Sequence, residues 1–266
     1  DRKMSYLVDT HCHLIFKDFR EDLDSVINNA FNSRVKAMLA ISTQENEFNP
    51  LIALTQKYSN IFCSIGIHPH SAHLHSELNE EKIIKFVDNE SVIGIGETGL
   101  DFYYENSEKN IQIQLFKRHI NVSRETQLPI IIHTRDADKA TIDILNEESK
   151  RGEFPGVIHC FTAGPELAKA ALDLGFYISL SGIVTFKNAG ELRETIKDIP
   201  IDRILVETDS PYLSPEPVRG GRNEPANVIH TAKYLAEFYD IDKETFYQKT
   251  TDNFLKLFNK AKITNE

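Results

Sequence analysis

Residues 129–160 read PIIIHTRDADKATIDILNEESKRGEFPGVIHC and hold the pattern that decides the fold. An apolar run at 130–132 enters through Pro129, a helical pattern follows at 138–146, and a second apolar run stands at 156–158 after Pro155. A short buried strand, a helix and another short buried strand predict a parallel pair joined by a crossover. The strands end in His133 and His159, so the segment also predicts polar groups at the carboxyl ends of neighbouring strands.

The same alternation continues along the chain in both directions. Strands are expected at 6–9, 35–41, 61–65, 92–95, 130–132, 156–158, 176–180 and 204–206. Helices are expected at 19–31, 49–58, 80–87, 109–126, 138–146, 165–174 and 189–197, with a helical tail from Asn227. Eight strands separated by helices favour an α/β protein with a closed (β/α)8 TIM barrel, and an open doubly wound sheet is the alternative.

Length and patterning are consistent with one barrel. The chain has 266 residues, and such barrels typically take about 250. It contains no short-period repeat, low-complexity tract or linker, so we expect a single domain over 1–266. The longest irregular stretches are 68–75 and 210–222. Within the helix expected at 19–31, the predicted buried face consists of Leu23, Val26, Ile27, Ala30 and Phe31.

Charge and cysteine usage exclude several classes of protein. A formal net charge of −10 and a pI near 5.5 argue against broad binding of duplex nucleic acid, although a local basic site is compatible with them. The chain has no apolar run of the roughly 20 residues needed to span a bilayer, so no membrane association is expected. Cys12, Cys63 and Cys160 are too few for a disulfide framework, and no apolar signal segment precedes Asp9. We expect a cytoplasmic protein, and no obligate protein partner is inferred.

The first expected strand leads to a pair of histidines. His11 and His13 are two positions apart, so alternation along a strand places both side chains on one face and Cys12 on the other. Two imidazoles in this arrangement can reach one metal ion. Paired histidines on a strand are more often incidental, and Cys12 is more simply a packed small apolar residue than a third ligand.

Further candidate ligands follow the fourth, fifth and sixth strands. Glu97 stands between Gly96 and Gly99, where it could bridge two ions or simply be a solvated loop acid. His133 and His159 each follow an apolar run, and two histidines facing one rim favour a shared ligand set over separate core roles. Arg135 could clamp a phosphate or orient Glu97, and for Asp101 a structural partner such as Arg135 is the simpler interpretation.

The eighth strand leads to Glu207 and Asp209, which are again two positions apart. Asp209 could ligate an ion and accept a proton from water, and a turn role is the alternative. Together His11, His13, Glu97, His133, His159 and Asp209 supply nitrogen and oxygen ligands for two divalent ions, if they converge. Such a set accepts Zn, Mg, Mn, Fe, Co or Ni, so the sequence does not identify the metal.

The residues at these strand ends resemble those of the TatD-type metal-dependent deoxyribonucleases, within the wider amidohydrolase-like barrel superfamily. The resemblance covers nearly the whole chain. Its motifs, in order, are DTHCHL at 9–14, GIHPH at 66–70, GETGLD at 96–101, IHTR at 132–135, HCF at 159–161, ETDSPYL at 207–213 and the segment 219–225.

The resemblance implies a role for each candidate residue. It implies that His11, His13 and Asp209 surround one ion, that His133 and His159 surround the other, and that Glu97 bridges them. It also implies that His68 faces the substrate phosphate and that Asp209 acts on the attacking water. Without it, the cluster His68, His70, His73 and His75 would be interpreted as a mostly solvated loop.

Two positions depart from the family pattern. The family commonly has lysine where Gly221 stands and glycine where Ala163 stands, although Gly164 keeps a turn possible. The loop around Gly221 still offers Arg219 and Arg222, which could bind phosphate or be ordinary surface charges. Because Gly221 removes one cation from this loop, weaker phosphate affinity or a different preferred substrate is expected.

Together these features predict a hydrolase that cleaves phosphodiester bonds in DNA, from an end or on single strands, with metal-activated water. Its expected catalytic residues are Asp209, Glu97 and His68, and its expected substrate-binding residues are His68, Arg135, Arg219 and Arg222. One alternative is a related metallohydrolase acting on an amide, ester or small phosphate, because the same ions polarise carbonyl groups. A noncatalytic metal-binding scaffold is disfavoured by the intact set of ligand candidates.

Overall fold

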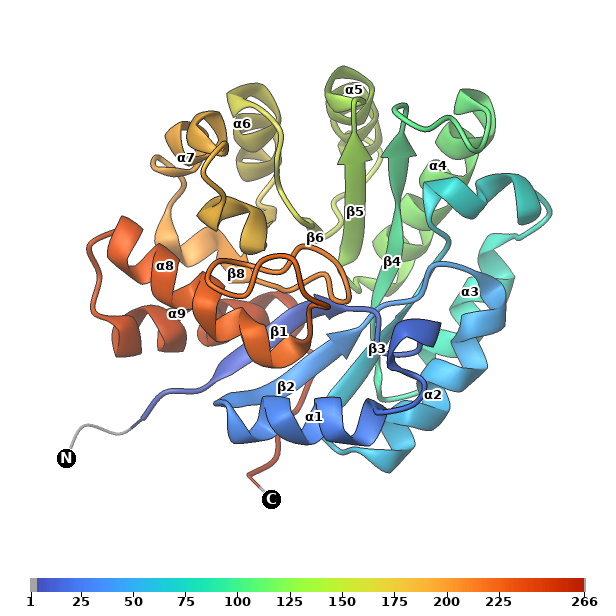
Figure 1. Ribbon diagram of the computed structural model, residues 1–266. Coiled ribbons are helices and arrows are strands. Elements are labelled where there is room, and N and C mark those ends of the chain that lie inside the picture. Colours follow the sequence, from blue (N-terminus) through green and yellow to red (C-terminus); the bar gives the residue numbers. More distant parts are fainter. Residues whose placement is uncertain (1–3, 266) are drawn as a thin grey trace.

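The computed structural model describes residues 4–265 and has a parallel barrel at its centre (Figure 1). Eight strands lie in the order β1 to β8, and a parallel bridge between Cys12 and Ser210 links the end of β1 to the segment after β8. The predicted (β/α)8 barrel is confirmed, because an open doubly wound sheet would reverse its strand order. The strands are β1 (Leu7–Cys12), β2 (Val35–Ala40), β3 (Ile61–Ile65), β4 (Val92–Asp101), β5 (Ile130–Arg135), β6 (Gly156–Ile158), β7 (Tyr177–Leu180) and β8 (Ile204–Val206).

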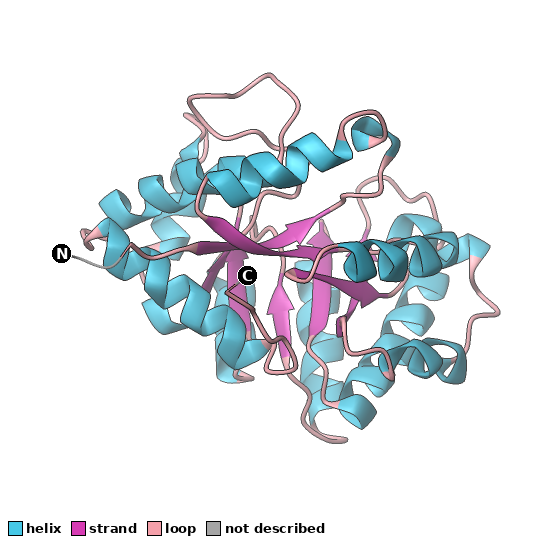
Figure 2. Ribbon diagram, turned by 90° about the horizontal axis from the view of Figure 1, so that it is seen from below, coloured by secondary structure: helices cyan, strands magenta, loops and turns pink. Residues whose placement is uncertain are grey.

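Helices surround the barrel (Figure 2). They present apolar faces to the strands, as crossover helices do in parallel barrels. No helix within residues 4–265 is both long and apolar enough to cross a membrane. The helices are α1 (Leu23–Asn32), α2 (Phe48–Lys57), α3 (Glu80–Val87), α4 (Lys109–Thr126), α5 (Asp138–Ser149), α6 (Pro165–Asp173), α7 (Gly190–Ile196), α8 (Val228–Phe238) and α9 (Lys243–Leu257).

Besides the apolar cluster between the helices and the strands, a second buried apolar cluster contains residues of the strands and of the end of the chain. Val8, Leu39 and Ile131 from three strands belong to one buried cluster with Phe254 and Phe258 at the end of α9. These large rings, both at most 1% exposed, pack against β-strand side chains. This cluster and the larger one between the helices and the strands contain most of the buried apolar side chains, and the polar candidates gather at the carboxyl ends of the strands.

Three strands that carry candidate residues, β1, β4 and β5, end later than predicted. β1 reaches Cys12 and includes His11, whereas β8 ends at Val206 as predicted, before Glu207. β4 runs six residues beyond Ile95, to Asp101, because it stays paired with β5 up to Arg135. Gly99 permits this close pairing, since a Cβ atom there would lie 1.9 Å from the carbonyl oxygen of His133. The predicted end of the fourth strand is therefore wrong, and the extra length carries Glu97.

The prediction for the first helix is wrong at its start. α1 begins at Leu23, and Phe19 belongs to a separate 3-10 turn in which its side chain is fully buried. The apolar periodicity included Phe19 because the buried turn continues the pattern of the helix. Val26, Ile27 and Ala30 face the core as expected, but Phe31 is 36% exposed.

Candidate metal centre

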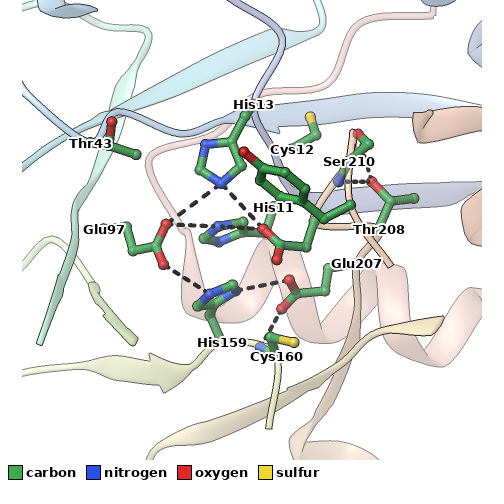
Figure 3. Close-up of polar contacts among 12 residues, drawn as sticks. His11, Cys12, His13, Thr43, Glu97, His159, Cys160, Glu207, Thr208 and Ser210 are labelled. Carbon is green, nitrogen blue, oxygen red and sulfur yellow. Dashed lines mark hydrogen bonds and ion pairs between the residues drawn. The ribbon is translucent and has the colours of Figure 1, made fainter. Parts of the chain in front are cut away.

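Glu97 lies at the centre of the candidate site and is 3% exposed (Figure 3). Its Oε1 atom lies 3.3 Å from His11 Nε2 and 3.6 Å from His13 Nε2. Its Oε2 atom lies 3.0 Å from His159 Nε2 and 3.3 Å from His133 Nδ1. The two oxygens of one carboxylate therefore face two different pairs of histidines.

Asp209 completes the group around Glu97 Oε1. Its Oδ1 atom lies 3.2 Å from His13 Nε2 and 3.5 Å from His11 Nε2. Its backbone has a positive φ of 55°, and its amide donates to the carbonyl oxygen of His11 at 2.8 Å. We call His11, His13 and Asp209 the first half of the site, and His133 and His159 the second half, with Glu97 shared between them.

Unpartnered ring nitrogens show that the first half fits a divalent ion. Both ring nitrogens of His11 and the Nδ1 atom of His13 are buried without a hydrogen-bond partner among residues 4–265. Leaving buried polar atoms unpaired is costly, and imidazole nitrogens with carboxylate oxygens are ordinary ligands of divalent ions. Burial also lowers the pKa of His11, which keeps a lone pair on the ring at neutral pH.

Buried carboxylates lie behind the second half. Asp101 Oδ2 lies 2.9 Å from His133 Nε2, and Glu207 Oε2 lies 2.9 Å from His159 Nδ1. Glu207 Oε1 accepts the amide hydrogen of Cys160 at 2.7 Å. A carboxylate bonded to one ring nitrogen fixes the tautomer, so that the other nitrogen presents its lone pair. Each imidazole of the second half is thereby oriented toward Glu97.

The histidines and carboxylates of the second half stabilise each other's charged forms. Burial alone would lower the pKa of His159, but Glu207 and Glu97 hold that pKa well above its ordinary value. Asp101 and Glu97 likewise raise the pKa of His133 against the effect of burial. Burial would raise the pKa of Glu97, but His159, His68 and His11 hold it well below its usual range. Glu97 is therefore ionised and available as a ligand.

The histidines of the segment after β3 do not form a solvated loop, so that interpretation is wrong. The segment forms a 3-10 helix, Pro69–Leu74, and His68 caps it by accepting the amide hydrogen of His70 at Nδ1. His68 Nε2 lies 3.5 Å from Glu97 Oε2, and His70 Nε2 lies 3.0 Å from Asp101 Oδ2. His73 is exposed but bonds to Ser107. The structure thus brings His68 to the centre, where the family resemblance implied a role for it.

The expected pairing of Asp101 with Arg135 is also wrong. The two residues are register neighbours across β4 and β5, but their side chains point to different partners. Asp101 contacts His133 and His70, whereas the Arg135 guanidinium lies over the rings of Tyr103 and Tyr104, at 4.0 and 4.9 Å from their centroids. Asp101 therefore supports the site directly, a role that the sequence analysis missed.

A cavity of about 530 Å³ opens above these groups. Arg219 and Arg222 are absent from its lining: Arg219 lies 3.8 Å from the ring centroid of Phe186, and Arg222 forms a two-pronged ion pair with Asp22. Their role in substrate binding stays a prediction. The lining consists of His13, Phe16, Thr43, His68, His70, Ser71, Glu97, Tyr104, His133, Arg135, His159, Asp209 and Tyr212.

The sequence analysis missed Glu207 as a supporting residue and the aromatic side chains of the cavity. A signal for Glu207 existed, because alternation placed it beside Asp209 and a buried histidine usually needs a second partner. Phe16, Tyr104 and Tyr212 carried no comparable signal, since a lone aromatic residue after a strand is more often part of the core.

A closed parallel barrel with histidines and carboxylates gathered around one shared carboxylate defines a barrel protein with a candidate metal centre. Residues 8–259 match the family of TatD related DNases, and the chain belongs to this family. The resemblance stated from the motifs is confirmed.

Individual relatives agree with this membership. A Buchnera aphidicola protein named as an uncharacterized metal-dependent hydrolase is 44% identical over 258 residues, which cover 96% of each chain. The Salmonella typhimurium protein named 3'-5' ssDNA/RNA exonuclease TatD is 33% identical over 95% of this chain and 98% of its own. The crystal structure of the TatD homologue YJJV from Escherichia coli has a TM-score of 0.89 and 25% identity, covering 95% of this chain and 98% of its own.

Proposed function

We propose that the protein is a two-metal phosphodiesterase that cleaves DNA from an end or on single strands. This proposal is carried by the position of the Glu97 carboxylate between the two halves. Its Oε1 atom faces the first half of the site, and its Oε2 atom faces the second half. The Salmonella relative named as a single-stranded DNA and RNA exonuclease supports a nucleic-acid substrate. The identity of the ions stays open, because the donor set accepts several metals.

The proposed ions would be held by His11, His13 and Asp209 in the first half and by His133 and His159 in the second, with Glu97 between them. When bound, two such ions lower the pKa of water and neutralise charge that develops on phosphoryl oxygens. Water attack forms one phosphorus–oxygen bond while the bond to the leaving nucleotide oxygen breaks.

Three side chains of the cavity would act on water and substrate. Asp209 is 15% exposed and lies at the cavity wall, where its carboxylate would accept the proton that the attacking water loses. His68 lines the same cavity, and burial holds its pKa well below the ordinary value, so it would offer a neutral imidazole to the phosphate. Arg135 supplies a permanent positive charge at the mouth of the cavity.

The test is metal-dependent digestion by pure protein. End-labelled single-stranded and double-stranded DNA would be incubated after chelation and after return of Mg, Mn or Zn, beside a panel of esters and amides. We expect DNA cleavage that the chelator abolishes and a metal restores. Cleavage of an ester or amide but of no DNA would contradict the proposed substrate and favour the alternative hydrolase.

The variant Asp209→Asn examines the residue assignment. It should fold normally and lose nearly all turnover, because an amide does not accept the proton from water. Asp143→Asn, a change at an exposed carboxylate on α5, is the matched control and should retain full turnover. Wild-type rates in Asp209→Asn would discredit the assignment.

A further inference from the structure

Exposed aromatic side chains gather around the cavity. Tyr103, Tyr104 and Tyr212 are 55%, 54% and 52% exposed. They are three of the seven exposed large apolar residues in the described part of the chain, which otherwise are Met4, Phe31, Leu74 and Val218. Tyr104 and Tyr212 line the cavity, and Tyr103 lies against Tyr104. Large rings left partly in water beside a candidate active site indicate a binding role.

One aromatic group follows β1 and β8. The Phe16 ring stacks on His13, with centroids 4.4 Å apart and planes 14° apart, and its edge faces Tyr212 at 6.3 Å. The amide of Phe16 donates to the carbonyl oxygen of His13, and that of Tyr212 donates to the carbonyl oxygen of Asp209. Phe16 and Tyr212 are thereby positioned directly by the residues of the first half.

The other aromatic group follows β4. The amides of Tyr103 and Tyr104 both donate to Asp101 Oδ1, at 3.1 and 3.2 Å. The same carboxylate contacts His133 through its other oxygen. Arg135 covers both tyrosine rings, and Tyr104 meets His70 edge-on at 5.4 Å. The strands lie in chain order around the barrel, so β4 is opposite β8 and the two groups flank the centre.

We propose that these groups are two stacking subsites for unpaired nucleobases, Phe16 and Tyr212 on one side of the scissile phosphodiester and Tyr104 on the other. The inference rests on the proposed nuclease function and adds to it how the protein holds its substrate. Aromatic rings stack on any base, because every base offers a π face. Bases inside a duplex are covered on both faces, so single strands and frayed ends are selected without sequence preference.

Apart from the proposed ions, the charges of the protein itself offer little affinity for such a substrate. The protein has a formal net charge of −10, and Arg135 is the one lysine or arginine in the cavity lining of the described chain. A strand held mainly by phosphate contacts would need several cations. Stacking on rings fixed by the carboxylates and carbonyls of the site supplies the binding that the charge does not.

The test combines substitutions in the protein with removal of single bases from the substrate. Tyr104→Leu and Tyr212→Leu keep an apolar side chain but remove the π face, and Tyr104→Phe and Tyr212→Phe keep it. Phe31→Leu, at an exposed ring on α1 outside the cavity, is the control. Substrates are oligothymidylates, intact or with one abasic residue on either side of the scissile bond.

Each leucine variant should raise KM for the intact strand about tenfold, in keeping with the loss of one stacked base. The phenylalanine variants and Phe31→Leu should stay within about twofold of the wild type. On a strand already abasic at the matching position, the leucine variant should lose nothing further. Equal losses on intact and abasic strands, or no loss at all, would overturn the stacking subsites.

Binding of a slowly hydrolysed phosphorothioate oligothymidylate, followed by fluorescence anisotropy, separates this inference from the proposed function. Base-dependent binding by a protein that cleaves no strand would support the subsites and overturn the nuclease activity. If the protein cleaves DNA but binds intact and abasic strands equally well, the subsites would be overturned and the proposed nuclease activity would be unaffected.

Discussion

In the second half of the site, His133 and His159 each turn one ring nitrogen toward Glu97 and the other toward a buried carboxylate. In the first half, the Nδ1 atoms of His11 and His13 have no such partner in residues 4–265. The buried carboxyl group beside β1 is Asp9, which bonds to Thr208, and burial raises its pKa to about 8. Among residues 4–265, the Nδ1 atoms of the first half therefore have no carboxylate bonded to them.

This difference indicates that the halves are prepared unequally for an ion. In the second half the supporting carboxylates orient the rings before an ion arrives, which reduces the cost of binding once the rings have lost their protons. In the first half Asp209 is the direct carboxylate partner, and it is the more exposed of the two carboxylates that face the rings. We expect the second half to bind its ion more tightly.

The largest effect should come from removing the group that both halves share. Glu97→Gln keeps the shape of the side chain but removes its charge, so both ions should weaken together. Turnover should fall by more than about 100-fold, the upper end of what a supporting partner costs. Metal content per protein measures the outcome, and retention of one full ion would show that the halves are independent of Glu97.

Removing the supporting carboxylates should weaken metal binding in the second half more than in the first half. Asp101→Asn and Glu207→Gln should each weaken the ion of the second half by about 10- to 100-fold. The first half should lose less affinity, because in the described residues each of these carboxylates bonds to a ring of the second half and neither bonds to a ring of the first. Calorimetric titration that resolves two sites tests this, with Asp143→Asn as the control. Equal weakening at both sites would contradict the comparison.

Binding of an ion should release more protons from the second half than from the first half. An imidazole must lose its proton before it binds an ion. The pKa values of both His133 and His159 are raised, so these rings keep protons to higher pH, whereas in the first half the pKa of His13 is raised and that of His11 is lowered. Affinity at the second half should therefore fall more steeply as the pH drops through neutrality. Titration in two buffers of different ionisation enthalpy counts the protons, and equal counts at both sites would refute the expectation.

The smallest effect should come from Arg222, which belongs to neither half. Its guanidinium is paired with Asp22, and the two side chains are 38% and 43% exposed. Arg222 is absent from the lining of the cavity, so Arg222→Ala should change KM for a single strand by less than about threefold. A larger change with a reduced salt dependence would show that Arg222 leaves Asp22 to bind phosphate.

The sequence predicted the barrel and the convergence of the six candidate ligands, because apolar runs and alternation determine which residues reach the carboxyl rim. It did not predict the length of β4, since Gly96 and Gly99 are poor strand formers and the pairing with β5 compensates for them. It also missed the partner of Asp101. The alternation of side chains along a strand predicts which face of the strand a residue is on. It does not predict which of several polar groups on that face a carboxylate will contact.

The two halves also differ in how far apart their residues lie in the chain. In the second half, His133 and Asp101 are 32 positions apart and His159 and Glu207 are 48 apart. In the first half, His13 and Asp209 are 196 positions apart and meet only where the end of β1 is joined to the segment after β8. Contacts between distant positions form late in folding because the intervening loop must close first. The first half can thus assemble only after the chain has been synthesised past Asp209 and the last strand has docked on the first, so competence to hold both ions would coincide with completion of the barrel.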